Sequence, residues 1–268
     1  MKRDAPVDRL IALALDEDLG AAGDVTTTAL VPADAQGVAE LWAKEPMVLS
    51  GLQVFARVFE TVDPSISVDF SAADGERTSS KQRIATLRGP LRGLLIGERT
   101  ALNFVQRLSG IATATRRSVE LIAKVKGTKL RLLDTRKTTP GLRSLSKLAV
   151  RHGGGHNHRF GLFDGVLIKD NHIAAVGGSV RTAVERAQAN APRLVKIEIE
   201  VTSLAQLREA IEAGAHIVML DNMNDADVAK AVKLAAGRVE LEVSGGITDE
   251  RLPILAKLGV DYVSMGAL

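Results

Sequence analysis

The second half of the chain alternates between short apolar runs and longer segments with helical spacing. The apolar runs predict strands at residues 129–134, 165–169, 194–201, 216–221, 239–243 and 261–265. Helical spacing follows at residues 179–191, 203–213, 225–236 and 248–258. Three of these helices are expected to begin at a capping residue, namely Ser179, Ser203 or Thr248. Repeated βα units predict a parallel sheet with helices outside it.

The number of strands limits the architecture of this α/β region. Six predicted strands are fewer than the eight of a closed βα barrel. We therefore expect an incomplete βα barrel of six to seven strands, with a doubly wound open sheet as the alternative.

The first hundred residues mix helix and strand. Val7–Leu15 has helical spacing, and Val38–Leu49 and Ile66–Phe70 have the pattern of strands. From Glu98 to Lys124 apolar residues recur on one helical face, which predicts a long helix that connects two domains.

Composition narrows the class of protein. A chain of 268 residues with 46% hydrophobic content can bury a full core. It has no cysteine, which excludes disulfides and thiolate chemistry. Aromatic residues make up only 3%, which disfavours nucleic acid as a partner. The polar amino terminus and the lack of a long apolar run predict a cytoplasmic enzyme that does not enter membranes.

Positive charge is concentrated between Arg131 and His172. This window holds eight of the basic residues and four of the five histidines, against three acids, although the net charge of the whole chain is only +3. A solvated charged face is the plain alternative, but solvation does not require the triple glycine 153–155 within the window. Arginine binds carboxylate or phosphate through two parallel hydrogen bonds. The window therefore predicts an anion site.

Charged residues also follow or end the predicted strands, where βα barrels carry their chemistry. Arg136 and Lys137 follow one strand, and Lys169 ends another. Glu200 and Asp221 lie near the ends of two neighbouring strands, where they suit a sugar diol, a Mg²⁺ held through water or a developing positive charge. An internal salt bridge to Lys169 or Arg136 is the alternative, and it is compatible with these roles.

Alternating charge along residues 196–201 places Glu198 on the same face as Glu200. Glu198 lies further from the carboxyl end of the strand, so we expect it to pair with an internal cation rather than to meet a ligand.

Two glycine-rich turns follow the last predicted strands. One contains Ser244, Gly245 and Gly246, and the other contains Gly266 and Ala267. Such turns at the last strands of a βα barrel form its usual phosphate site.

The histidines are weak candidates for zinc. His152, His156 and His158 lie in or beside the triple-glycine loop, without an acidic co-ligand expected nearby. We expect His158, next to Arg159, to donate to an anion, and His216 to be structural.

Together these segments resemble the quinolinate phosphoribosyltransferase family. The resemblance runs from residue 23 to the end of the chain and is carried by many motifs: Gly23–Thr27, Glu98–Asn103, Ser109–Thr113, Asp134–Gly141, Gly153–Gly155, Asn157–Arg159, Leu167–His172, Leu220–Asn222, Ser244–Gly246 and Gly266–Leu268. Family members usually continue into a further helix beyond the last motif, where this sequence ends.

The resemblance implies an amino-terminal α/β sandwich domain over residues 1–107 and an open βα barrel over residues 108–268. It implies a homodimer that converts quinolinate and phosphoribosyl pyrophosphate, with Mg²⁺, to nicotinate mononucleotide, pyrophosphate and CO₂. Arg99 would reach the neighbour's site, and Glu200 and Asp221 would face ribose and metal. The other implied substrate-binding residues are Thr135, Arg136, Lys137, His158, Arg159, Lys169, Ser244, Gly245, Gly246, Gly266 and Ala267, of which Lys137 and Lys169, with Glu200 and Asp221, are expected to be catalytic.

Two alternatives remain open at this point. One is the molybdenum-transport-associated relative of the family, which shares Asp134–Lys137 and the glycine triplet but differs over Lys169–His172. The other is a catalytically silent anion-binding protein.

Overall fold

The computed structural model describes residues 5–268 and divides them into two compact units. The first unit contains residues up to Ala114 together with Pro140–Gly154, and the second contains Thr115–Thr139 and Gly155–Leu268. Helix α4 (Leu91–Ala123) passes through the boundary. The sequence predicts one division, between residues 107 and 108, whereas in the structure the first unit also includes the later segment Pro140–Gly154.

The second unit is built on a parallel sheet of six strands in the order β4-β9-β8-β7-β6-β5. The strands are β4 (Arg131–Leu133), β5 (Val166–Ile168), β6 (Ile197–Val201), β7 (Ile217–Asp221), β8 (Glu240–Ser244) and β9 (Tyr262–Ser264). The first strand of the unit, β4, pairs with the last, β9. This pairing of first and last strands is a feature of βα barrels. Within the described residues the opening lies between β4 and β5, so the predicted incomplete barrel is confirmed, with six strands.

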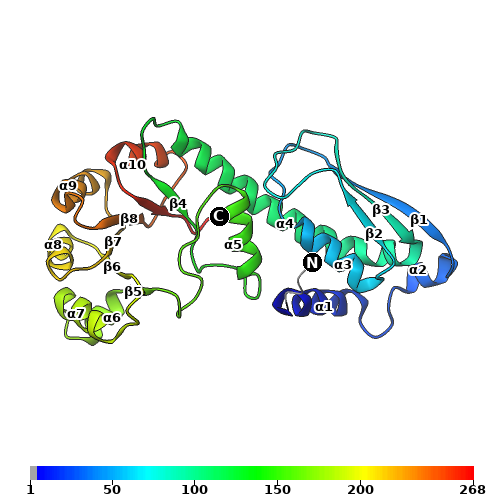
Figure 1. The fold of residues 1–268 in the computed structure, drawn as a ribbon, viewed down its shortest axis with the longest axis horizontal. Helices are drawn as coiled ribbons and strands as arrows, with labels where there is room; N and C mark the ends of the chain where they lie inside the picture. The colour runs from blue at the N-terminus through cyan, green and yellow to red at the C-terminus, as the bar shows by residue number, and fades with distance from the viewer. Residues whose placement is uncertain (1–4) are drawn as a thin grey trace. The chain divides into compact units, whose positions relative to one another are not determined.

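Helices cover the outside of this sheet in chain order, as Figure 1 shows. They are α6 (Asp170–Ala175), α7 (Val180–Asn190), α8 (Leu204–Glu212), α9 (Asp225–Ala235) and α10 (Leu252–Leu258). The predicted caps Ser179 and Ser203 are confirmed, since their side chains accept the Thr182 and Gln206 N–H groups.

The predicted cap Thr248 is wrong. Helix α10 begins only at Leu252, after Arg251, because residues 248–251 form a turn in which the Thr248 carbonyl accepts the Arg251 N–H. The side chain of Asp249 within this turn accepts the Ser118 hydroxyl at 2.8 Å.

The two faces of the strands differ in chemistry. Alternate aliphatic residues of β6, including Ile197 and Ile199, join the buried core beneath the helices. Because side chains alternate along a strand, Glu198 and Glu200 face the interior of the barrel. On β8 the same alternation puts Leu241 in that core and Glu242 in the interior.

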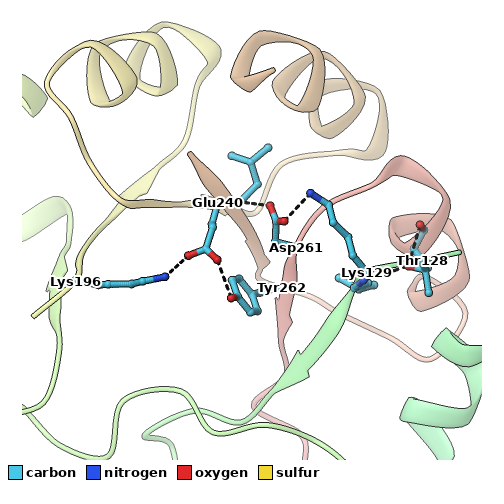
Figure 2. Close-up of polar contacts among 9 residues, drawn as sticks. Thr128, Lys129, Lys196, Glu240, Asp261 and Tyr262 are labelled. Carbon is cyan, nitrogen blue, oxygen red and sulfur yellow. Dashed lines mark hydrogen bonds and ion pairs between the residues drawn. The ribbon is translucent and has the colours of Figure 1, made fainter. Parts of the chain in front are cut away.

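Ion pairs join the strands at their amino ends, opposite to the edge where chemistry is expected (Figure 2). Glu240 receives Lys196 Nζ at 2.5 Å and the Tyr262 hydroxyl at 3.0 Å. Asp261 pairs with Lys129 at 2.6 Å and accepts the Leu241 N–H at 2.9 Å. These contacts tie β6, β8, β9 and the start of β4 together, which is the stabilising role of this end of a βα barrel.

The first unit packs helices against an antiparallel sheet of three strands in the order β1-β3-β2. Its elements are α1 (Ala5–Leu19), α2 (Val25–Leu30), β1 (Gln36–Ala43), α3 (Leu52–Val62), β2 (Ser67–Phe70), β3 (Gln82–Pro90), the first part of α4 and α5 (Arg143–His152). Phe55, Phe59, Leu87 and Leu108 are among the residues of its core. Among the described residues, no helix is both long and apolar enough to span a bilayer.

Candidate functional site

The predicted site residues of the second unit gather at one edge of the sheet. Because its six strands are parallel, their carboxyl ends lie together. Lys137 follows β4, Lys169 follows β5, Asp221 ends β7 and Gly266 follows β9. Arg99 is the exception, because it lies on an exposed position of α4 in the first unit.

Lys169 is held between two strands. Its Nζ lies 2.7 Å from Glu200 Oε2 on the neighbouring strand β6, so the internal salt bridge considered from the sequence is present. The His172 ring accepts the Lys169 backbone N–H at 2.9 Å. The lysine side chain is still 46% exposed, so the ammonium group can also reach a ligand.

Asp134, which directly follows β4, fixes the segment after the triple glycine. One carboxylate oxygen accepts the Asn157 side-chain amide at 2.6 Å, and the other accepts the His158 backbone N–H at 2.9 Å. Asp134 is buried, with 4% of its surface exposed. From the sequence, Asp134 is an acid within the basic window and the first residue of a family motif, with no role of its own; its contacts make it the anchor for the segment that holds His158 and Arg159.

Arg159 and Arg136 form the positive centre of the site. Burial and the charge of Arg136 lower the pKa of Arg159. Its guanidinium also donates to the Gly165 carbonyl at 3.3 Å. Two guanidinium groups that repel each other while partly buried are stabilised by a bound anion.

The His158 ring turns towards the barrel interior. Its Nε2 lies 3.1 Å from Glu198 and 3.6 Å from Glu242, while its Nδ1 accepts the Arg159 backbone N–H at 2.7 Å. The expected pairing of Glu198 with an internal cation therefore becomes a pairing with a histidine. Burial opposes protonation of His158, but the hydrogen bond to Glu198 and the charge of Glu242 outweigh it and raise the pKa of His158.

Glu242 is a polar residue of the interior that the sequence analysis missed. Burial, together with the charge of Glu198, raises the pKa of Glu242 to about 8. The signal was present, because residues 239–243 alternate between aliphatic and acidic side chains as β6 does. Three groups, His158, Glu198 and Glu242, have potential ligand atoms within 4.8 Å of one another. This corrects the sequence-based premise that His158 has no acidic neighbour.

The turns after β7 and β8 fit closely together. Asn222 has a left-handed backbone (φ 54°), and its N–H donates to the Ser244 carbonyl at 3.0 Å. Its side-chain amide donates to Asp221 at 2.7 Å. Arg251 joins the turns from outside, with Nη2 2.6 Å from the Met223 carbonyl and Nη1 3.5 Å from the Gly245 carbonyl.

The turn after β9 lies against the loop after β4. Lys137 Cδ would be 3.5 Å from a Cβ placed on Gly266, and the Thr135 hydroxyl accepts the Lys137 N–H at 3.0 Å. The Met265 N–H donates to the Leu133 carbonyl at 3.1 Å. The second glycine turn is therefore next to the loop that contains Lys137. A phosphate bound at the turn and an anionic group bound by the lysine would occupy one site.

Sequence models of two domains match this chain. The quinolinate phosphoribosyl transferase N-terminal domain matches residues 24–109, and the C-terminal domain of the same family matches residues 111–268. The chain belongs to the quinolinate phosphoribosyltransferase family. Both halves of the sequence-based resemblance are thereby confirmed.

Curated relatives and solved structures agree with this assignment. A probable nicotinate-nucleotide pyrophosphorylase [carboxylating] from Bacillus subtilis is 44% identical over 252 residues, which cover 94% of this chain and 85% of the relative. A quinolinate phosphoribosyltransferase [decarboxylating] from Nicotiana tabacum is 38% identical, covering 97% of this chain and 77% of the relative. The crystal structure of NadC from Streptococcus pyogenes superposes with a TM-score of 0.93 at 43% identity, covering 100% of this chain and 93% of that one.

Proposed function

We propose that this chain is a quinolinate phosphoribosyltransferase that makes nicotinate mononucleotide, pyrophosphate and CO₂ from quinolinate and phosphoribosyl pyrophosphate. The observation that carries the proposal is the partly buried pair Arg136 and Arg159 at the same sheet edge as Lys169. A dicarboxylate is the kind of ligand that this density of cations fits.

The two substrates are assigned to different parts of the edge. The carboxylates of quinolinate face Arg136, Lys137, Arg159 and Lys169, with His158 beside them. The 5′-phosphate of the second substrate faces the turns that contain Ser244, Gly245, Gly246, Gly266 and Ala267, with Thr135 in the adjoining loop. The ribose lies between these parts, next to Glu200 and Asp221.

This placement supports a simple course of reaction. As pyrophosphate leaves, positive charge develops at C1 of the ribose, where the carboxylates of Glu200 and Asp221 stabilise it. The ring nitrogen of quinolinate forms the new bond to C1. The positively charged ring then accepts the electron pair of the bond to the adjacent carboxylate, which leaves as CO₂, and a proton takes its place on the ring. The ring nitrogen carries no proton, so the first step needs no general base.

Magnesium is part of the proposal. Glu200 and Asp221 present carboxylate oxygens near the ends of the paired strands β6 and β7, and hard oxygen donors suit Mg²⁺. We assign the ion to these two residues, through water, where it would neutralise the charge of the pyrophosphate group.

The oligomeric state is also part of the proposal, and an exposed arginine supports it. Arg99 is exposed on α4 in the unit that does not carry the barrel. We propose that the protein is a homodimer in which this arginine completes the site of the neighbouring subunit. The cytoplasmic location expected from the sequence belongs to the same proposal.

The direct test is to incubate the purified protein with quinolinate, phosphoribosyl pyrophosphate and Mg²⁺ and to identify the products. The proposal requires nicotinate mononucleotide and pyrophosphate, with neither formed when one substrate is left out. A protein that binds quinolinate but forms no nucleotide would be the silent anion-binding alternative.

A further inference from the structure

Two buried carboxylates lie side by side in the barrel interior without a lysine or arginine partner among the ion pairs of the described residues. Glu198 is 6% exposed and Glu242 is 1% exposed. The ion pairs of both are with His158. Within residues 5–268, the second oxygen of each, Oε1, is buried and has no hydrogen-bond partner. Such groups are costly in a protein interior unless something satisfies them.

One proton held between the two glutamates lowers the cost of burying both, and the side chain of Glu242 has hydrogen bonds to Glu198 and to Ser264. In two adjacent buried carboxylates the ionised form of one is disfavoured, because their charges repel each other and burial favours the neutral form. Glu242 is the more buried of the two and lies further from His158, at 3.6 Å against 3.1 Å for Glu198. The raised pKa of Glu242 agrees with placing the proton there.

The hydrogen bonds of His158 determine its tautomer. Because Nδ1 accepts the Arg159 backbone N–H, that nitrogen carries no proton. The single proton of the neutral ring is then on Nε2, which donates to Glu198. A metal ion on Nε2 would require the same nitrogen to be unprotonated, so this arrangement disfavours a metal at the three groups. Glu198 and Glu242 favour a doubly protonated ring. Protonating Nδ1, however, would break its hydrogen bond with the Arg159 N–H, which favours the neutral ring.

We propose that Glu198 and Glu242 are positioning residues: Glu242 donates to Glu198, Glu198 accepts the Nε2 proton of His158, and the ring holds the backbone of Arg159. This inference rests on the proposed function, because its purpose is to direct the Arg159 guanidinium at quinolinate. The chain of contacts reaches from β8 through β6 to the segment anchored by Asp134.

Substitutions of Glu242 separate positioning from simple filling of the core. Glu242→Leu removes the donor to Glu198 but fills the space, and it leaves the Glu198 carboxylate buried with one hydrogen bond fewer, which costs stability. We expect its melting temperature to fall, while the KM for quinolinate rises about tenfold, the size of effect seen when a residue that orients a metal ligand is removed. The KM for phosphoribosyl pyrophosphate should stay within about twofold. Glu242→Gln, which keeps an N–H donor, should restore most of the affinity for quinolinate.

A matched control is available on the same strand. Glu240→Gln removes a carboxylate at the amino end of β8, where it contacts Lys196 and Tyr262. It should leave both KM values unchanged. If Glu242→Leu is folded and keeps the wild-type KM for quinolinate, the positioning role is wrong. Should that variant not fold, Glu198→Gln weakens the hydrogen bond to His158, and its effect is read from the His158 nitrogen signals because the charge of Glu198 also acts on Arg159.

Nitrogen NMR tests the arrangement without any substrate, so its outcome does not depend on the proposed function. In protein labelled with ¹⁵N-histidine, the His158 signals are identified by their loss in His158→Gln. We expect a protonated Nε2 and an unprotonated Nδ1 in the wild type, and a changed Nε2 signal in Glu198→Gln. A ring with its proton on Nδ1, a doubly protonated ring or one bound to metal through Nε2 would each overturn the proposal.

Discussion

The side chain of Asn222 occupies the space next to Gly245 that any larger residue would need. A Cβ built on Gly245 would lie 2.2 Å from Asn222 Oδ1, and Gly245 has a left-handed backbone with φ of 89°. The Asn222 amide also donates to Asp221 at the end of β7, so Asn222 contacts both the glycine turn and this acid.

Gly245→Ala should therefore damage the binding of phosphoribosyl pyrophosphate. The methyl group must displace Asn222, which disturbs the turn and Asp221 together, and we expect the KM for this substrate to rise at least tenfold. Gly237→Ala is the matched control, because Gly237 also has positive φ (76°) but has nothing within 4 Å of its Cβ position. It should lower stability by about 1 kcal/mol and leave KM unchanged. Gly245→Ala should cost less in an Asn222→Gly background than in the wild type; an equal cost in both backgrounds would mean that the collision is not the cause.

Lys169→Ala should reduce catalysis far more than stability. The Lys169–Glu200 pair is at the sheet edge with the lysine 46% exposed, and ion pairs of this kind contribute about 0–1 kcal/mol to folding. A lost charged hydrogen bond to quinolinate costs about 1.5–3 kcal/mol. Steady-state kinetics and thermal denaturation of the same preparation measure both effects. A variant that melts much earlier yet keeps its kcat/KM would show that Lys169 is a structural ion-pair member.

Glu242 makes stability depend on pH. Its pKa is raised from 4.5 to about 8 by burial and the charge of Glu198, so the folded protein keeps a proton that the unfolded chain loses across this range. The free energy of unfolding should therefore fall as pH rises from about 4.5 to about 8, by up to about 1.4 kcal/mol per pH unit from this group, and the contribution should be constant above that range. Urea denaturation at a series of pH values measures the slope. Glu242→Gln should reduce it and Glu240→Gln should not; equal slopes in wild type and Glu242→Gln would contradict the assignment.

The repeating part of the fold was predictable because each βα unit carries its own local pattern. All six barrel strands occur where apolar runs predicted them, and Ser179 and Ser203 cap helices as expected. Helix α3 and strand β3 were not identified, although α3 carries a local signal, with Phe55, Val58 and Phe59 on its buried face. Thr248 failed as a cap because tertiary contacts of Asp249 and Arg251 outweigh the local signal.

The candidate site was predictable to a lesser degree. Strand-end residues such as Lys169 and Asp221 can be recognised from the sequence, because each is a charged residue that ends an apolar run. Glu242 and Asp134 do not stand out in this way. Their roles depend on which strands are neighbours in the barrel and on the return of the loop after the triple glycine to β4.

The proposed dimer can be tested by complementation. A chain with Arg99→Ala and a chain with Lys169→Ala should each be nearly inactive alone. After subunit exchange, half of the dimers are mixed and each mixed dimer has one intact site, so about a quarter of wild-type activity should return. If no activity returns while mixed dimers are shown to form, Arg99 does not serve the neighbouring subunit.

Discrimination between quinolinate and nicotinate tests the central claim most directly. The claim is that the cations at the carboxyl ends of β4 and β5 recognise two carboxylates, of which one is lost as CO₂. With quinolinate labelled in the carboxylate next to the ring nitrogen, we expect one labelled CO₂ for each pyrophosphate formed, and a kcat/KM at least tenfold above that for nicotinate, as one lost charged hydrogen bond implies. Equal turnover of nicotinate, or pyrophosphate release without labelled CO₂, would contradict the account.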